Sequence, residues 1–306
     1  MTINTKSMRI DAMNMWPAKF QFPFERDISE LLAKHNFMTP ITTCRIKNND
    51  DHEYHRIVSS ILDGLDSLPE RPDRSFESLW IPIDVEMERL KVPNVRGGKF
   101  KAFVDHLRTA EITNGIRNQL FLFLENAPLQ ACEYAAIRIL EAIDNPGEHS
   151  EGYLARVRVA VGTDFAKDFA TKYLPRIKGY PADVVAAELR KAGSFIRNVM
   201  RGRVMTLGGH NYGIDPYGRL AMFSSVVLPN IRNERFHGNV FSSYRSSVRE
   251  MKHYASDCFI SALAYSLILI VLAYRWPDAV DQAELENTLQ SNTERFQTLF
   301  RQQLGA

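Results

Sequence analysis

The sequence predicts an all-α protein, and three observations support this class. From residue 55 onward, apolar residues recur every three or four positions, which is the period of one face of an α-helix. Segments rich in proline and glycine, such as 145–147, interrupt these stretches at intervals typical of helices. The composition, 45% hydrophobic and 24% charged, is that of a globular protein with a sizeable core. We therefore expect a helical bundle with one main core.

The first part of the chain differs from the rest. It contains a segment rich in proline and phenylalanine, a short helix, a possible strand and a polar turn, at 16–24, 27–35, 41–46 and 47–51. These features predict a small N-terminal appendage. The predicted organisation is an appendage at 1–54, a helical domain at 55–277 and a C-terminal amphipathic helix within 278–306.

The helices of the domain follow from apolar spacing and from the breaks between them. Ile57, Ile61 and Leu65 share one face of a first helix. A second helix begins near Asp73 and carries Trp80 on its apolar face. Further helices are expected at 99–109, 116–126, 128–143, 151–173, 181–200, 219–229, 241–275 and 278–304.

The apolar runs, the N-terminus and the cysteines indicate where in the cell the protein is expected. The longest apolar run, 259–274, is shorter than the roughly 20 residues of a spanning helix, so we expect a buried core helix and no membrane partner. The N-terminus lacks the apolar core of a signal peptide, and Cys44, Cys132 and Cys258 form no disulfide or zinc pattern. A cytoplasmic location is therefore expected. The net charge of +2 permits a nucleic-acid partner without requiring one.

Two segments contain residue types that bind metals or nucleotides. Residues 50–55 combine His52 and His55 with neighbouring carboxylates, which suit a metal. Acidic residues are also common in the first turn of a helix, where the helix dipole favours them, so we expect no metal and no cofactor. The glycine-rich segment 202–218 fits neither the phosphate-loop nor the dinucleotide-loop spacing, and we expect a loose loop there.

Basic residues gather at two places. Arg156 and Arg158 make a small basic face. A denser cluster runs into the glycine-rich segment and includes Arg197, Arg201 and Arg203. Such a cluster is consistent equally with a grip on phosphates and with a solvated helix face. We retain its three arginines as weak candidates for RNA binding.

The strongest candidate site is the polar stretch 231–239, which lies between two apolar runs. Arg232 offers a planar fork of donors that matches a phosphate, and His237 titrates near neutrality and can move a proton. They lie five positions apart along the chain, and we expect both to face the same cleft. The spacing alone is common in this chain. What distinguishes this pair is Asn233 directly after the arginine, Gly238 directly after the histidine, and the flanking apolar helices.

The stretch Ile231-Arg232-Asn233-x-x-x-His237-Gly238 resembles the R-N-x-x-x-H-G signature of the HEPN superfamily, a group of α-helical bundles. The segment 74–81 is similar to the apolar early helix of prokaryotic members. The resemblance covers about residues 55–275, so a HEPN-like bundle with extra helices is expected. It leaves out the N-terminal appendage and the last helix.

The resemblance implies a function and residue roles. Members are commonly metal-independent endoribonucleases that act as toxins, abortive-infection proteins or other antiviral defence effectors, and they usually form homodimers in which two Arg/His motifs meet. By motif position, Arg232 binds the phosphate, His237 is the acid/base and Asn233 is its polar partner. Arg235 and Arg245 are weak candidates for further RNA contacts. A toxin subfamily has tyrosine two residues after the histidine, where this chain has an asparagine, so a paired nucleotidyltransferase antitoxin is not expected.

Other interpretations remain open at this stage. The chain could be a non-catalytic RNA- or nucleotide-binding HEPN module, acting as a subunit or regulator of a larger defence complex with a sensor protein. It could also be an interaction protein that oligomerises through its last helix, 278–304. The Arg/His pair could simply tie its helix to neighbouring helices.

Overall fold

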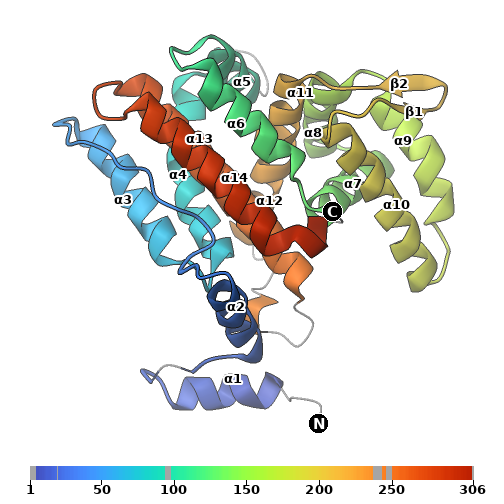
Figure 1. Cartoon of the computed structure of the whole chain (residues 1–306). Helices are drawn as coiled ribbons and strands as arrows, with labels where there is room; N and C mark the ends of the chain where they lie inside the picture. Colours follow the sequence, from blue (N-terminus) through green and yellow to red (C-terminus); the bar gives the residue numbers. More distant parts are fainter. Residues whose placement is uncertain (1–4, 19, 94–97, 237–242, 246–249, 305–306) are drawn as a thin grey trace.

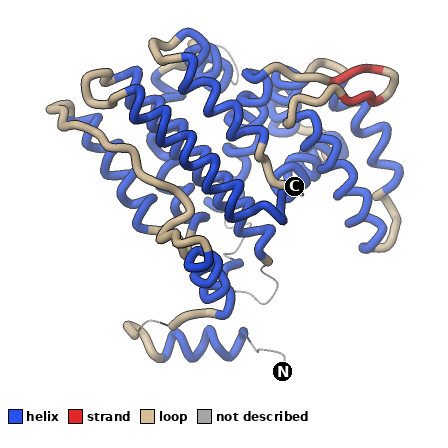
Figure 2. Tube along the Cα trace, in the orientation of Figure 1, coloured by secondary structure: helices blue, strands red, loops and turns tan. Residues whose placement is uncertain are grey.

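The computed structural model describes residues 5–18, 20–93, 98–236, 243–245 and 250–304. Within these residues the chain is helical apart from one short hairpin, which confirms the expected all-α class (Figures 1 and 2). Helix α1 (Thr5–Asn14) lies apart from the other helices in Figure 1. The other helices and strands pack around one continuous core.

The helices before the hairpin follow one another with short connections, except for the longer segment 35–51 between the first two of them. They are α2 (Pro23–Lys34), α3 (His52–Asp66), α4 (Pro72–Arg89), α5 (Gly98–Thr109), α6 (Asn114–Glu125), α7 (Leu129–Asp144), α8 (Glu148–Val161), α9 (Phe165–Tyr173) and α10 (Ala182–Met200), with a 3₁₀ turn at Leu174–Arg176. After the hairpin come α11 (Pro216–Ala221), a π-helix (Met222–Val227), α12 (Leu228–Phe236), a 3₁₀ turn (Ser243–Arg245), α13 (Met251–Arg275) and α14 (Gln282–Leu304).

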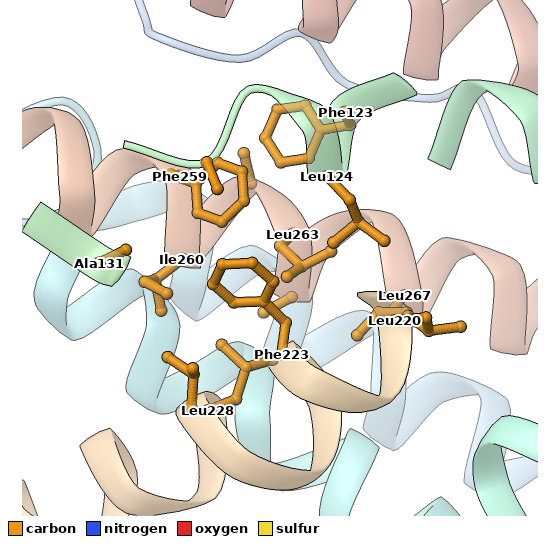
Figure 3. Packing of buried hydrophobic residues seen from close by; sticks show 14 of the residues in the cluster. Phe123, Leu124, Ala131, Leu220, Phe223, Leu228, Phe259, Ile260, Leu263 and Leu267 are labelled. Atoms are coloured by element: carbon orange, nitrogen blue, oxygen red, sulfur yellow. The ribbon is translucent and has the colours of Figure 1, made fainter. Parts of the chain in front are cut away.

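Helix α13 forms the centre of the core. It is apolar on all sides and is buried almost throughout, because α4 and α14 pack against it. Phe259 of α13 stacks on Phe123 with ring centroids 5.0 Å apart and meets Phe223 edge-on at 5.1 Å (Figure 3). Among the described residues, α13 is the one helix long and apolar enough to cross a membrane, and most of it is buried inside the protein.

The C-terminal helix buries the apolar stripe that the sequence shows. The side chains of Leu285, Leu289, Phe296, Leu299 and Phe300 are all buried. Helix α14 packs against α6 and α13, so the chain itself covers this stripe. Residues of the N-terminal segment, including Phe24, Ile28 and Ile41, belong to the same core.

Two local predictions are wrong. The segment 41–46 is not a strand, because its backbone bonds to side chains instead: the Cys44 N–H donates to the Tyr265 hydroxyl at 3.0 Å and the Thr42 N–H to Asn292 Oδ1 at 2.5 Å. The single helix expected at 151–173 is two helices, α8 and α9. Gly162 separates them with φ of +127°, a backbone conformation that side chains disfavour.

The glycine-rich segment is more ordered than expected. It contains a two-stranded antiparallel hairpin, β1 (Met205–Leu207) and β2 (His210–Tyr212), whose turn places Gly208 and Gly209 at positive φ. Asp168 of α9 holds the hairpin: its Oδ2 lies 2.7 Å from His210 Nδ1 and accepts a 2.7 Å hydrogen bond from the Tyr212 hydroxyl.

The long helix expected at 241–275 starts later, at Met251. Upstream, the helix expected at 219–229 extends in both directions, from Pro216 through the π-helix to Phe236. The stretch between Phe236 and the 3₁₀ turn lies outside the described residues. The helix that carries Arg232 is therefore described up to the residue before His237.

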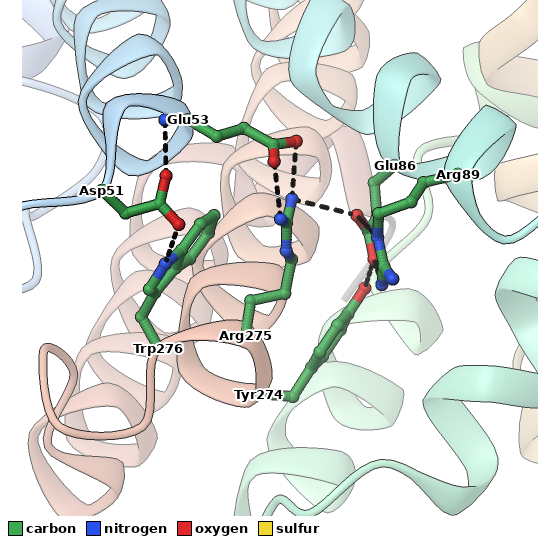
Figure 4. Close-up of polar contacts among 7 residues, drawn as sticks. All are labelled: Asp51, Glu53, Glu86, Arg89, Tyr274, Arg275 and Trp276. Carbon is green, nitrogen blue, oxygen red and sulfur yellow. Dashed lines mark hydrogen bonds and ion pairs between the residues drawn. The ribbon is translucent and has the colours of Figure 1, made fainter.

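A buried carboxylate, Glu86, ties α4 to the end of α13 (Figure 4). Glu86 is only 1% exposed, and it accepts hydrogen bonds from Arg89 at 2.6 and 2.8 Å and from the Tyr274 hydroxyl at 2.5 Å. Arg275 lies 3.4 Å from Glu86 and donates two bonds of 2.7 Å to Glu53 of α3. Each charged group in this network has an oppositely charged partner.

Two carboxylates of the segment 50–55, Asp51 and Glu53, bond to residues at the end of α13. Asp51 caps α3 by accepting the Glu53 N–H at 2.7 Å and also accepts the Trp276 indole N–H at 3.0 Å. These bonds lower the pKa of Asp51, the backbone bond from Glu53 contributing most. The segment 50–55 therefore has a structural role in joining α3 to the end of α13.

Candidate functional site

A cavity of about 1560 Å³ contains the first two residues of the predicted motif. Helices α4, α5, α7, α8, α11 and α12 and the π-helix contribute to its walls. Arg232 and Asn233 both line it. Its volume exceeds the roughly 300–1,000 Å³ of pockets for small molecules, so it is large enough for part of a polymer.

Arg232 is a half-buried residue of the cavity wall. Its Nη1 donates to Asn233 Oδ1 at 3.1 Å, and its guanidinium carbon lies 4.5 Å from the centroid of the Phe236 ring. Its Nε is buried without a hydrogen-bond partner, and no described carboxylate pairs with it. The neighbouring amide and ring therefore orient this charge without neutralising it.

Glu234 and Arg235, which follow Asn233, form ion pairs that connect α12 to neighbouring helices. Glu234 forms an ion pair with Arg138 of α7, whose Nη1 lies 2.8 Å from Glu234 Oε1. Arg235 lies 3.2 Å from Asp73 and 3.0 Å from Glu77 of α4. These ties fix the orientation of α12 and so the position of Arg232.

Asp73 shows how closely Arg235 is tied to the fold. Burial raises the pKa of this carboxyl, but the hydrogen bonds and charges of Arg71 and Arg235 outweigh burial and bring the pKa below its usual value. Arg235 therefore has a structural role, and its predicted contact with RNA would have to compete with its ion pairs to Asp73 and Glu77.

His237, the predicted acid/base, lies outside the described residues, as does Gly238. Helix α12 is described up to Phe236, which directly precedes the histidine. Where the imidazole lies relative to Arg232 therefore remains a prediction from the sequence.

The other predicted RNA-binding arginines do not line the cavity. Arg201 donates to the Leu304 carbonyl at 2.7 Å, and Arg203 donates to Asn198 at 3.1 Å. Arg197 is half-buried on α10, and Arg245 is exposed beside the ring of Phe22. The structure does not bring this group together with Arg232.

Arg156 of α8 lines the cavity. From the sequence it was noted only as part of a small basic face with Arg158, and it was not predicted as a site residue. Its Nε donates to the Ser225 carbonyl at 2.7 Å and its Nη1 to the Gly152 carbonyl at 3.2 Å. The guanidinium carbon lies 5.1 Å from the ring centroid of Phe100 and 5.7 Å from that of Tyr153. Burial lowers the pKa of Arg156, although an arginine remains protonated at neutral pH.

A proline explains why Arg156 has a partner in the π-helix. Pro229 has no N–H, so it cannot donate to the carbonyl of Ser225 four residues earlier. Arg156 supplies a donor to this carbonyl. π-helical turns are rare and are frequent at functional sites, and this one forms part of the cavity wall.

The cavity is lined by equal numbers of acidic and basic side chains, including Glu148 and Glu151, and only some of the basic ones form ion pairs with described residues. Lys99 pairs with Asp84, Lys101 with Asp105, Arg108 with Asp215, and Arg138 with Glu141 and Glu234. Arg156, Arg158 and Arg232 make no ion pair with a described residue. None of the side chains outside the described ranges is acidic. The cavity therefore holds arginines that an anionic ligand could neutralise.

Comparison with known protein families, with curated proteins and with solved structures finds no match to this chain.

Proposed function

We propose that this protein is a metal-independent endoribonuclease of the HEPN type, which acts in the cytoplasm as a defence effector. The observation that carries the proposal is Arg232, a half-buried arginine that pairs with no carboxylate of the described residues, lines a large cavity and shares a helix turn with Asn233. The chemistry of the motif gives its residues distinct roles.

The reaction requires a proton acceptor, a proton donor and a positive charge at the phosphate. The 2′-hydroxyl of RNA attacks the adjacent phosphorus as His237 takes its proton, and the bond from phosphorus to the 5′-oxygen breaks as that oxygen receives a proton. Arg232 stabilises the charge that develops on the phosphoryl oxygens. The products are a 2′,3′-cyclic phosphate and a 5′-hydroxyl, without net oxidation or hydrolysis in this step.

A second copy of the chain is part of the proposal. One histidine cannot be protonated and unprotonated at once, and a homodimer would place two motifs beside one RNA strand. The second histidine would then supply the proton to the leaving oxygen. A sensor or regulatory protein could control this assembly.

The direct test is cleavage of cellular RNA by the purified protein in EDTA. We expect cleavage by the wild type and a loss of roughly 10²–10³-fold in Arg232→Ala, as when a single charge-stabilising donor is removed. His237→Ala should be inactive. Arg301→Ala is the matched control, because Arg301 is exposed on α14 and does not line the cavity. Equal activity in the wild type, Arg232→Ala and His237→Ala would reject the proposal.

A second function is favoured by Arg156. This residue can hold an anion but has no role in proton transfer, so the cavity could serve a non-catalytic RNA- or nucleotide-binding module of a larger complex. Salt-dependent RNA binding by the wild type without cleavage products would support that function over the first.

A further inference from the structure

We propose that Arg156 binds a backbone phosphate of an RNA strand that extends along the cavity toward Arg232. The inference rests on RNA as the ligand of the proposed function but requires no cleavage. It assigns a binding role to a residue outside the Arg/His motif.

The hydrogen bonds of Arg156 leave part of its fork free. A guanidinium has five N–H donors, and two of those on Arg156 are used on the carbonyls of Ser225 and Gly152. Three donors remain. The two carbonyls and the rings of Phe100 and Tyr153 fix the plane of the group, so a phosphate oxygen meets donors that are already oriented.

The π-helix continues directly into α12, and this continuous helix connects the partner of Arg156 to Arg232. Arg156 is bonded to Ser225, and Arg232 follows Ser225 by seven residues on that helix. Seven residues of helix rise roughly 10 Å, and Arg156 and Arg232 both line the same cavity. Two separated arginines that line one cavity suit a ligand with several phosphates better than a ligand with one.

The other charges of α8 are distributed along its length. Glu148 and Glu151 are in the first turn, whereas Arg158 is in the last turn and is exposed at the cavity. Arg156 and Arg158 therefore lie toward the basic end of this helix. An anionic strand at this end of α8 would meet both of these arginines.

The test uses an uncleavable probe, a short single-stranded RNA with 2′-O-methyl groups, and measures its binding by fluorescence anisotropy. Methylation blocks the attacking hydroxyl, so binding is read independently of cleavage. We expect Arg156→Ala to weaken binding roughly 10- to 100-fold, since hydrogen bonds to charged groups are lost. The affinity of Arg156→Lys should lie between those of the wild type and Arg156→Ala, because lysine keeps the charge but lacks the planar set of donors.

A second pair of variants avoids removing Arg156, which also helps to hold the π-helix. Val159 lines the cavity three residues after Arg156 and is 64% exposed, so polar residues fit there without disturbing the core. Val159→Glu supplies the carboxylate that Arg156 lacks and should weaken binding at least about fivefold, as for an opposed charge at this spacing in a partly desolvated site. Val159→Gln is the matched control and should bind like the wild type.

The outcomes separate this inference from the proposed function. Weakened binding in Arg156→Ala and Val159→Glu supports the inference whether or not the wild type cleaves RNA. Wild-type affinity in both variants, with unchanged melting temperatures, overturns it even if cleavage is confirmed. Binding of a mononucleotide in place of the oligonucleotide, lost in the same variants, would overturn the assignment to an RNA strand.

Discussion

Arg275 and Arg156 are held in similar ways but differ in their partners. Each guanidinium lies beside an aromatic ring, Arg275 at 4.2 Å from the Trp276 centroid and Arg156 at 5.1 Å from that of Phe100. Arg275 makes two bonds of 2.7 Å to Glu53, whereas Arg156 bonds only to backbone carbonyls. The first charge is neutralised within the chain and the second is not.

The comparison separates structural charges from charges that suit a ligand. Leaving a charge unpaired away from water costs free energy, and the network around Glu86 avoids that cost with protein partners. The cavity arginines are half-exposed and keep part of their hydration while the site is empty. An anion that displaces this water would complete the coordination of Arg156 and Arg232 as Glu53 completes that of Arg275.

The largest expected effect on stability comes from removing Glu86. Glu86→Ala leaves the Tyr274 hydroxyl and Arg89 without their shared acceptor, so the free energy of unfolding should fall by about 3–5 kcal/mol. Urea denaturation measures this change. Arg232→Ala is the comparison variant and should stay within about 0.5 kcal/mol of the wild type, because its charge supports no described ion pair. Equal destabilisation by the two substitutions would contradict the distinction drawn between the two regions.

A smaller effect is expected from Arg235, which follows Arg232 by three residues on α12 and contacts α4 instead of the cavity. Arg235→Ala should lower the free energy of unfolding by about 2 kcal/mol, because buried Asp73 loses one of its two cations and keeps only Arg71. The comparison with Arg232→Ala is again direct, since both variants remove the same residue type from one short helix. A loss of RNA binding by Arg235→Ala without any loss of stability would instead indicate that Arg235 contacts the ligand.

The Arg235 variant also predicts a pH dependence. The pKa of Asp73 is lowered in the folded protein, so its contribution to stability is present above the unfolded pKa of about 3.9 and is lost as pH falls through the lower folded value. The wild type and Arg235→Ala should therefore differ at neutral pH and converge in acid. Denaturation curves at several pH values test this, and a constant difference down to acid pH would contradict it.

The sequence was sufficient to predict most of the helices because their apolar spacing is local. Helix α13 is an example: its long apolar run indicated a buried core helix, and it is buried almost throughout. The segment 41–46 shows the limit. Its residue types fit a strand, but whether an extended segment pairs with another strand or with side chains of distant helices depends on the tertiary structure.

The candidate site was predictable only in part. The motif drew attention to Arg232 and Asn233, and both line the cavity. Arg156 could not be singled out, because its partner Ser225 lies far along the chain. Pro229 was the one local signal: a proline inside a helix leaves a carbonyl without its usual donor, but the sequence does not say which side chain supplies one.

The smallest expected effect concerns the pair of Asp168 and His210, in which the carboxylate is half-buried and the imidazole is exposed to solvent. The hydrogen bond and charge of Asp168 raise the pKa of His210, so the stability that this pair contributes is present below the unfolded histidine pKa of about 6.5 and is lost as pH rises through the folded value. Asp168→Asn should return the His210 pKa toward its ordinary value, which NMR titration of the imidazole resonances can measure. The hairpin should also become easier to detach from α9 at acidic pH in the variant, which hydrogen exchange of the β1 and β2 amides would show. An unchanged His210 pKa in Asp168→Asn would mean that solvent screens this pair completely, and that only the half-buried charges of the protein distinguish paired from unpaired sites.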